Sequence, residues 1–231
     1  MIKTDFLLDR MNQDSADKPV PRPTSRKPCQ ARGQQRVEAI LEAAGSLIAA
    51  ESSISALTMH KLAEAAQTSI GSLYHFFPDK DCVIAALEEK HSLAFNQIVG
   101  DLALVPDAEW LPLSAQEVID RVFEPFFRYA DAHPEIFQLD CGRNQKDEPT
   151  LRNLFDKILK LRKPGISARQ RLLYAHMLES IIIGTSQNFN RAIGISKTEW
   201  TREVTVAQAA YLRSIEERHT TETRGKPHSK S

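Results

Sequence analysis

Residues 58-TMHKLAEAAQTSIGSLYHFFPDK-80 contain two short helical patterns separated by a turn. Thr58 is a favourable N-cap, because its hydroxyl can accept a hydrogen bond from a backbone N–H in the first turn. We therefore predict a short helix from Thr58 to about Ala65, a three-residue turn, and a second short helix over about 69–76. The Pro78-Asp79 pair then favours the end of that helix and the start of another.

Two short helices joined by a short turn form a helix-turn-helix, whose second helix can enter the major groove of DNA. A helical wheel of this second helix places Ile70 and Leu73 on an inward face and Gly71, Ser72 and His75 on an outward one. Glycine lacks a Cβ and so lets the backbone approach a phosphate or base edge closely. The pattern predicts a small, polar outward face that contacts DNA.

The run 58–80, together with 36-RVEAILEAA-44, resembles the DNA-binding region of the TetR family of transcriptional regulators. The pair Gln67-Thr68 departs from the family pattern, which has Gly-Val in the turn. Gln67 must therefore take a backbone conformation that glycine adopts more easily. The positions that match the family pattern are Thr58, Leu62, Ala63, Ala66, Ser69, Gly71, Leu73, Tyr74, Phe77 and Lys80.

The resemblance implies which side chains contact DNA. Thr58, Tyr74 and Lys80 resemble phosphate contacts. The positions where family members reach bases or phosphates are His60, Ser69, Ile70, Gly71 and Ser72. Ile70 has two interpretations, since it can touch a thymine methyl group or fill the core. The expected DNA-binding residues are Thr58, His60, Lys61, Ser69, Ile70, Gly71, Ser72, Tyr74, His75 and Lys80.

Periodic apolar residues predict an all-α chain. The expected architecture is an N-terminal three-helix DNA-binding domain followed by a larger helical domain. The first helix is expected from about Gln34 to Glu51, and later ones near 79–102, 114–131, 134–140, 149–162, 167–190 and 197–218. The predicted divisions are a disordered basic arm (1–30), a helix-turn-helix domain (31–88, motif 58–77), a helical regulatory and dimerisation domain (89–218), and a disordered tail (219–231).

The formal net charge is zero, which argues against a protein that coats nucleic acid non-specifically. Charge is nevertheless uneven, because the segment from Lys18 to Val37 has six Lys or Arg residues and no acidic residue. Such an arm can follow the DNA backbone or enter the minor groove. The alternative is a solvated leader with no measurable role.

The resemblance also implies a homodimer, and the last two predicted helices have features that suit an interface. Ser180 and Gly184 lie four residues apart, so two backbones could approach closely there. The alternative is that both helices belong to the core of a monomer. The candidate interface residues are Ser180, Ile181, Gly184, Trp200, Val204, Ala207 and Tyr211.

A small-molecule effector is the third implication. The segment 123–139 is rich in aromatic rings, and Pro125 within it can kink or restart the helix and open space. At each position, the alternative is an ordinary core residue. The candidate ligand contacts are Phe95, Trp110, Phe123, Phe127, Arg128, Phe137, His176, Met177 and Glu179.

Nothing in the sequence indicates an enzyme. Glycine-rich phosphate loops and metalloprotease motifs are absent, and the three cysteines have no Cys-x-x-Cys spacing, so we expect no cofactor and no metal. No apolar run suits a signal peptide or membrane span, so we expect a cytoplasmic protein. We predict a homodimeric repressor that a small molecule releases from a pseudo-palindromic operator in double-stranded DNA. The alternatives are a ligand-independent DNA-binding activator and a helical protein-interaction module.

Overall fold

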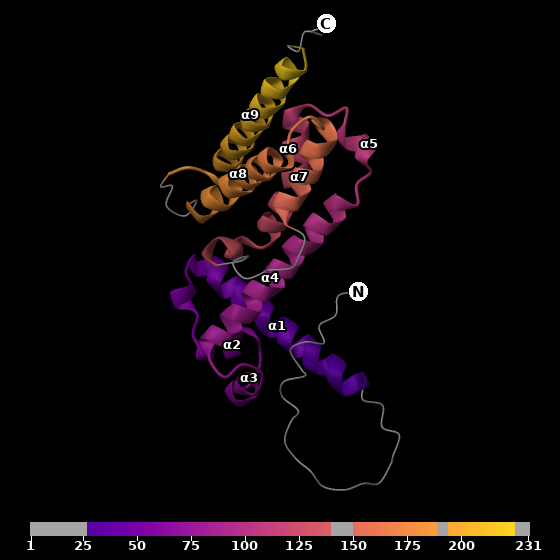
Figure 1. Cartoon of the computed structure of the whole chain (residues 1–231). Helices are drawn as coiled ribbons and strands as arrows, with labels where there is room; N and C mark the ends of the chain where they lie inside the picture. The colour runs from indigo at the N-terminus through magenta and orange to yellow at the C-terminus, as the bar shows by residue number, and fades with distance from the viewer. Residues whose placement is uncertain (1–26, 140–149, 189–193, 225–231) are drawn as a thin grey trace, which may run out of the picture. The chain divides into compact units, whose positions relative to one another are not determined.

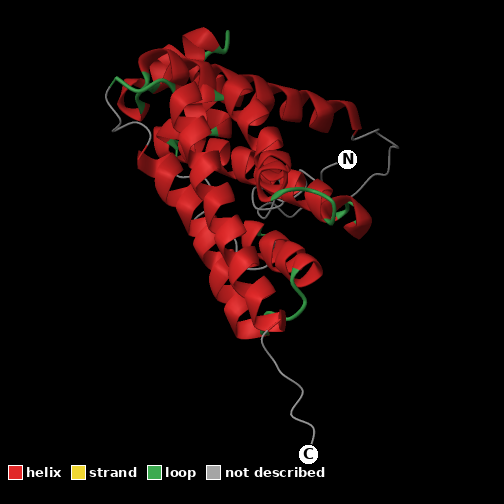
Figure 2. Ribbon diagram, turned by 90° about the horizontal axis from the view of Figure 1, so that it is seen from above, coloured by secondary structure: helices red, strands yellow, loops and turns green. Residues whose placement is uncertain are grey.

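The computed structural model describes residues 27–139, 150–188 and 194–224, and every regular element in these ranges is helical (Figures 1 and 2). The all-α prediction is confirmed. None of the helices in these ranges is long and apolar enough to cross a membrane. The elements are α1 (Lys27–Glu51), η2 (Ile54–Ala56), α2 (Met59–Ala65), α3 (Ile70–Phe76), α4 (Lys80–Ala103), α5 (Asp107–Trp110), α6 (Ala115–Ala132), η3 (Pro134–Gln138), α7 (Leu151–Arg162), α8 (Ala168–Asn188) and α9 (Lys197–Arg224).

The first hydrophobic core lies among the N-terminal helices. Burying a large aliphatic side chain stabilises the fold by about 1.5–3 kcal/mol, so a few such residues suffice to hold short helices in place. Leu62 of α2 and Leu73 of α3 are both fully buried in this core. Its other buried members are Ile40, Leu41, Ala44, Ile48, Leu57, Ala63, Phe77, Val83 and Leu87.

The second hydrophobic core lies among α4 to α9. In Figure 1, α8 and α9 lie side by side, and α6 packs against α9. The fully buried rings of Trp110, Phe123 and Phe155 belong to this core. Helix α4 contributes to both cores, through Val83 and Leu87 near its start and Val99 and Leu102 near its end. The predicted boundary between residues 88 and 89 therefore falls inside one continuous helix.

Several helix ends differ from the prediction. Helix α1 begins at Lys27 rather than near Gln34, so residues 27–30 are helical, in contrast to the predicted disordered arm. Pro28 is compatible with this start, because proline is tolerated in the first turn of a helix. Helix α9 extends to Arg224, past the predicted end at 218. The rest of the predicted arm and tail, residues 1–26 and 225–231, lies outside the described residues.

Helix α6 continues through Pro125, so the helix does not restart at this proline. Proline in a helix interior costs about 3 kcal/mol. Val122 and Phe123 before Pro125 and Ala130 after it are all buried. Burial on both sides of the proline outweighs its local cost. Residues 134–138, predicted as α-helix, form the 3-10 helix η3 instead.

Candidate nucleic-acid interface

Side-chain caps start both short helices of the predicted motif. The Thr58 hydroxyl accepts a hydrogen bond from the Lys61 backbone N–H at 3.3 Å, before α2. The Ser69 hydroxyl accepts one from the Ser72 N–H at 3.1 Å, before α3. Such a cap contributes about 1 kcal/mol, which matters for helices of seven residues each. Each hydroxyl retains its hydrogen as a donor, so capping does not prevent contact with a phosphate oxygen.

A carboxylate cap starts α4. Asp79 Oδ1 accepts a hydrogen bond from the Cys82 backbone N–H at 2.8 Å. Hydrogen bonds from Cys82 hold the pKa of the Asp79 carboxyl below its ordinary value, because they stabilise the ionised form. The local sequence therefore determines where α2, α3 and α4 each begin.

The turn between α2 and α3 has the glycine-like backbone conformation that the sequence predicted at Gln67. Gln67 has φ of +49°, in the left-handed region that glycine adopts most easily. The N–H of Gln67 donates to the carbonyl of Glu64 at 3.0 Å, and that of Thr68 donates to the carbonyl of Ala63 at 2.9 Å. This pair of bonds is a Schellman motif, so the turn closes in the usual way without glycine.

Helix α3 has the two faces that were predicted. Leu73 is fully buried, whereas Gly71 and His75 are exposed and Tyr74 is 48% exposed. Ser72, which was also predicted on the outward face, is half-buried. A Cβ added at Gly71 would meet no atom within 4 Å, so this glycine faces open space. Ile70 is partly buried against the first core, which favours its core-filling interpretation.

The remaining predicted contacts lie near the starts of the neighbouring helices. Thr58, His60 and Lys61 are exposed at the beginning of α2, and Lys80 is half-buried as the first residue of α4. Lys61 Nζ lies 3.7 Å from Glu51 Oε1, with both side chains more than half exposed. Exposed pairs of this kind contribute little, so the ammonium group can exchange this carboxylate for a phosphate.

The predicted effector contacts do not gather in one site. Trp110 and Phe123 are buried in the second core, and Glu179 is buried against Arg152, with Oε2 accepting from Nε at 2.8 Å. His176, Met177 and Arg128 are exposed. Phe137 lies under the Lys197 ammonium, 5.0 Å from the ring centre. Apart from Phe123, these positions are core, ion-paired or surface residues that share no common site in the structure.

One ring cluster joins α4 and α6. The Phe95 ring centre lies 5.7 Å from that of Phe126 and 5.5 Å from that of Tyr129. Phe123 lies 6.3 Å from Phe126 and 6.0 Å from Phe127. Phe95, Phe123 and Phe127 are thus the predicted effector contacts that the structure brings together.

Sequence reasoning missed Gln208, which is fully buried on α9. Neither its amide nitrogen nor its oxygen has a hydrogen-bond partner within the described part of the chain. Leaving such groups unpaired costs about 1–3 kcal/mol, so the site suits a polar group of a bound molecule or water. The sequence did contain a signal for this position. Gln208 lies four residues from both Val204 and Leu212, so it falls within an apolar stripe of the helix.

The predicted dimer contacts need one correction. Val204 is buried within its own chain and therefore cannot contact a partner. Tyr211 is half-buried against the second core. Ser180 and Ala207 are exposed, whereas Ile181, Gly184 and Trp200 are half-buried. Prediction missed a set of exposed apolar side chains on the same two helices, namely Leu172, Leu173, Met177, Ile183 and Val206.

Comparison with known proteins agrees with this geometry. Residues 40–87 match the family model described as bacterial regulatory proteins, tetR family. This segment contains α2, α3 and the ends of the helices around them. A search of curated proteins finds no match.

Solved structures resemble the fold at low sequence identity. A TetR-family transcriptional regulator from Streptomyces coelicolor superposes with a TM-score of 0.51 and 19% identity, over 78% of this chain and 98% of that one. A TetR transcriptional regulator from a Rhodococcus species gives 0.46 and 19%, over 78% and 97%. A TetR-family protein from Mesorhizobium loti gives 0.48 and 16%, over 79% and 98%. The first of these supports the same helical fold along most of the chain.

Proposed function

The chain belongs to the tetR family of bacterial regulatory proteins, and from this membership we propose that it is a homodimeric repressor released from its operator by a small-molecule effector. As a member of that family, it is a DNA-binding transcriptional regulator and not an enzyme. The repressor mechanism, the dimer and the effector are the proposed parts. The proposed site of action is the cytoplasm, where bacterial DNA is accessible.

The observation that carries the proposal is the outward face of α3. Leu73 holds the helix on the first core, while Gly71, Tyr74 and His75 face solvent. We propose that Gly71 brings the backbone close to the groove and that Tyr74 and His75 donate to phosphates or base edges. Lys80, at the start of α4, neutralises a phosphate on the same strand.

The proposed dimer uses the exposed apolar side chains of α8 and α9. Leu173, Met177 and Ser180 lie at i, i+4 and i+7, on one side of α8. Val206 and Ala207 are exposed on α9, which packs beside α8. Two copies would form a four-helix interface and remove these apolar groups from water. A two-fold pair then places its α3 helices roughly one turn of DNA apart, about 34–36 Å, as a pseudo-palindromic operator requires.

The proposed effector site lies beside the second core, between α4 and α6. The ring cluster of Phe95, Phe123, Phe126, Phe127 and Tyr129 supports a largely apolar ligand. Gln208 adds a buried amide with unpaired donor and acceptor groups, on a helix that packs against α6. A ligand with one polar group would satisfy both features. A ligand-independent activator of the same architecture remains the second candidate, and response to ligand separates the two.

Binding of the full-length chain to labelled duplexes from the DNA flanking its own gene tests the proposal. We expect retardation at low salt, with a logarithmic salt slope of roughly 0.9 for each phosphate that the protein neutralises. Lys80→Ala is expected to reduce the slope by about that amount on all sequences. Lys160→Ala, an equal charge change at an exposed position on α7, is the matched control and should leave the slope unchanged. Absence of any retardation by the wild-type chain would refute the DNA-binding proposal.

A second measurement tests the effector. Compounds that raise the Tm of the wild-type chain are added to the protein–DNA complex, and the fraction of bound DNA is measured. Release of DNA supports a ligand-responsive repressor. Ligand binding that leaves the complex intact, or tightens it, would favour the activator instead.

A further inference from the structure

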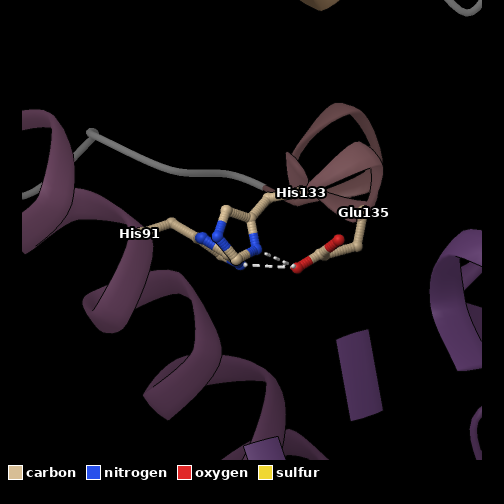
Figure 3. Close-up of side chains that lie close together, drawn as sticks. All are labelled: His91, His133 and Glu135. Atoms are coloured by element: carbon tan, nitrogen blue, oxygen red, sulfur yellow. Dashed lines mark hydrogen bonds and ion pairs between the residues drawn. The ribbon is translucent and has the colours of Figure 1, made fainter. Parts of the chain in front are cut away.

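Three potential metal ligands from separate elements meet beside the first core (Figure 3). His91 projects from the middle of α4, His133 ends α6, and Glu135 lies in the first turn of η3. His91 is fully buried and Glu135 is 6% exposed. A buried histidine and a buried carboxylate are costly to leave without well-placed partners, so this cluster needs an explanation.

The separations within the cluster match those around a tetrahedral ion. Glu135 Oε1 lies 3.3 Å from His91 Nε2 and 3.3 Å from His133 Nδ1. The three ligand atoms all lie within 4.8 Å of one another. Two ligand atoms that are each about 2.05 Å from a tetrahedral zinc ion lie about 3.3 Å apart. An ion can therefore occupy the space between these atoms with little movement of the side chains.

The hydrogen bonding of His91 suits a metal ligand. Its Nδ1 lies 2.7 Å from the Tyr129 hydroxyl, so an Nδ1–H can donate to that oxygen. The opposite nitrogen, Nε2, is buried and has no well-directed hydrogen bond within the described residues, although it points toward Glu135. Metal-binding histidines commonly donate their second N–H to an oxygen, which orients the ring and leaves the other lone pair for the ion.

The Glu135 carboxylate faces both imidazoles and is only 6% exposed, so little solvent competes for its oxygens. His133 is partly exposed, which provides an entry path and an open side for a fourth ligand such as water.

We propose that His91, His133 and Glu135 bind a divalent transition-metal ion of the zinc class. Two imidazole nitrogens and one carboxylate oxygen suit Zn²⁺, Co²⁺ or Ni²⁺, whereas Ca²⁺ and Mg²⁺ prefer ligand sets of oxygen only. The ion would fasten η3 and the end of α6 to α4. Glu135 also packs on α1, since a Cβ added at Gly45 would lie 2.8 Å from Glu135 Oε1. The site would thus tie the end of α6 and η3 to α1 and α4.

Metal titration of the tag-free, full-length chain, after removal of metal with a chelator, tests this proposal directly. We expect one Co²⁺ per chain, with the strong visible absorption of a tetrahedral site, and displacement of Co²⁺ by Zn²⁺. X-ray absorption of the zinc-loaded wild type should report two imidazole ligands with oxygen in the remaining positions. A wild-type chain that binds no stoichiometric Co²⁺, or a zinc site without imidazole, would overturn the proposal without any variant.

Variants then assign the ligands. Glu135→Gln keeps the side-chain size and should abolish the tetrahedral spectrum, as should His133→Asn. His176→Asn removes an exposed histidine on α8 and is the matched control, expected to bind as wild type does. Tyr129→Phe should weaken binding ten- to a hundredfold, because it removes the hydroxyl beside His91 Nδ1 but none of the three ligands. Unchanged binding by both ligand variants would place the ion elsewhere and refute the assignment.

Gly45→Ala adds a test that removes no ligand. The new methyl group would displace the Glu135 carboxylate, so the affinity for Co²⁺ should fall while far-ultraviolet circular dichroism stays helical. In parallel, Zn²⁺ should raise the Tm of the wild type but not that of Glu135→Gln. None of these readouts depends on DNA binding, so failure here and failure of the proposed function are distinguishable.

Discussion

Replacing Gly71 by alanine is expected to stabilise the fold and weaken DNA binding at once. Gly71 is the second residue of α3, and a Cβ added there would meet no atom within 4 Å. Alanine is favoured over glycine in a helix by about 0.5–1 kcal/mol. In a chain of this size a gain of 1 kcal/mol raises Tm by roughly 2–4 °C, so we expect an increase of about 1–4 °C.

The same methyl group opposes DNA binding. Under the proposed function, the α3 backbone at Gly71 approaches the duplex closely, and the methyl group would occupy that space. Each reduction of 1.4 kcal/mol in binding free energy lowers affinity about tenfold, and we expect a reduction of at least this size. Fluorescence anisotropy with a labelled operator, at one fixed salt concentration, measures the Kd of each variant.

Gly100→Ala is the matched control, because Gly100 lies within α4 and a Cβ there would also meet no atom within 4 Å. It should raise Tm in the same way and leave the Kd for DNA unchanged. If Gly71→Ala binds DNA as tightly as the wild type does, the backbone of α3 does not approach the groove. If it lowers Tm instead, the position is not open as the structure describes.

Three further outcomes are expected. Gln67→Gly should stabilise the fold by up to about 1 kcal/mol in chemical denaturation. Gln67 has φ of +49°, and left-handed backbone costs a non-glycine residue about 1–2 kcal/mol, which the greater entropy of unfolded glycine partly offsets. A decrease in stability would contradict that backbone conformation. Asp79→Ala should be less stable than wild type at pH 7, and the difference in stability should vanish as pH falls below 3.8, since a lowered folded-state pKa stabilises the fold only while the carboxyl is ionised. Urea unfolding at each pH measures this difference, and a difference that persists in acid would refute the cap. Met177→Glu, on the exposed side of α8, should convert the proposed dimer to monomer in sedimentation, because an unpaired carboxylate is costly to bury. The control Lys160→Glu should leave the dimer intact, and a dimeric Met177→Glu chain would place the interface elsewhere.

The parts of the fold that short-range chemistry controls were predictable from sequence. Thr58 and Ser69 cap helices through hydrogen bonds to residues three positions later, so the starts of α2 and α3 needed no knowledge of the rest of the chain. The alternation of Leu73 inward and Gly71 outward follows from helical periodicity alone. Even the unusual turn at Gln67 was visible, since glutamine stands where the resembled family has glycine.

Other features depended on which helices pack together. Apolar periodicity marks a stripe on α9 but cannot say whether it faces its own chain or a partner, and the structure places Val204 inward. Pro125 could have restarted the helix, and only the structure shows that α6 continues through it with buried side chains on both sides. His91 and Glu135 are separated by most of α4, α5 and α6, and their meeting follows from how those helices pack. Hydrogen bonds within one turn are encoded by neighbouring residues, whereas contacts between distant segments depend on the packing of every helix between them.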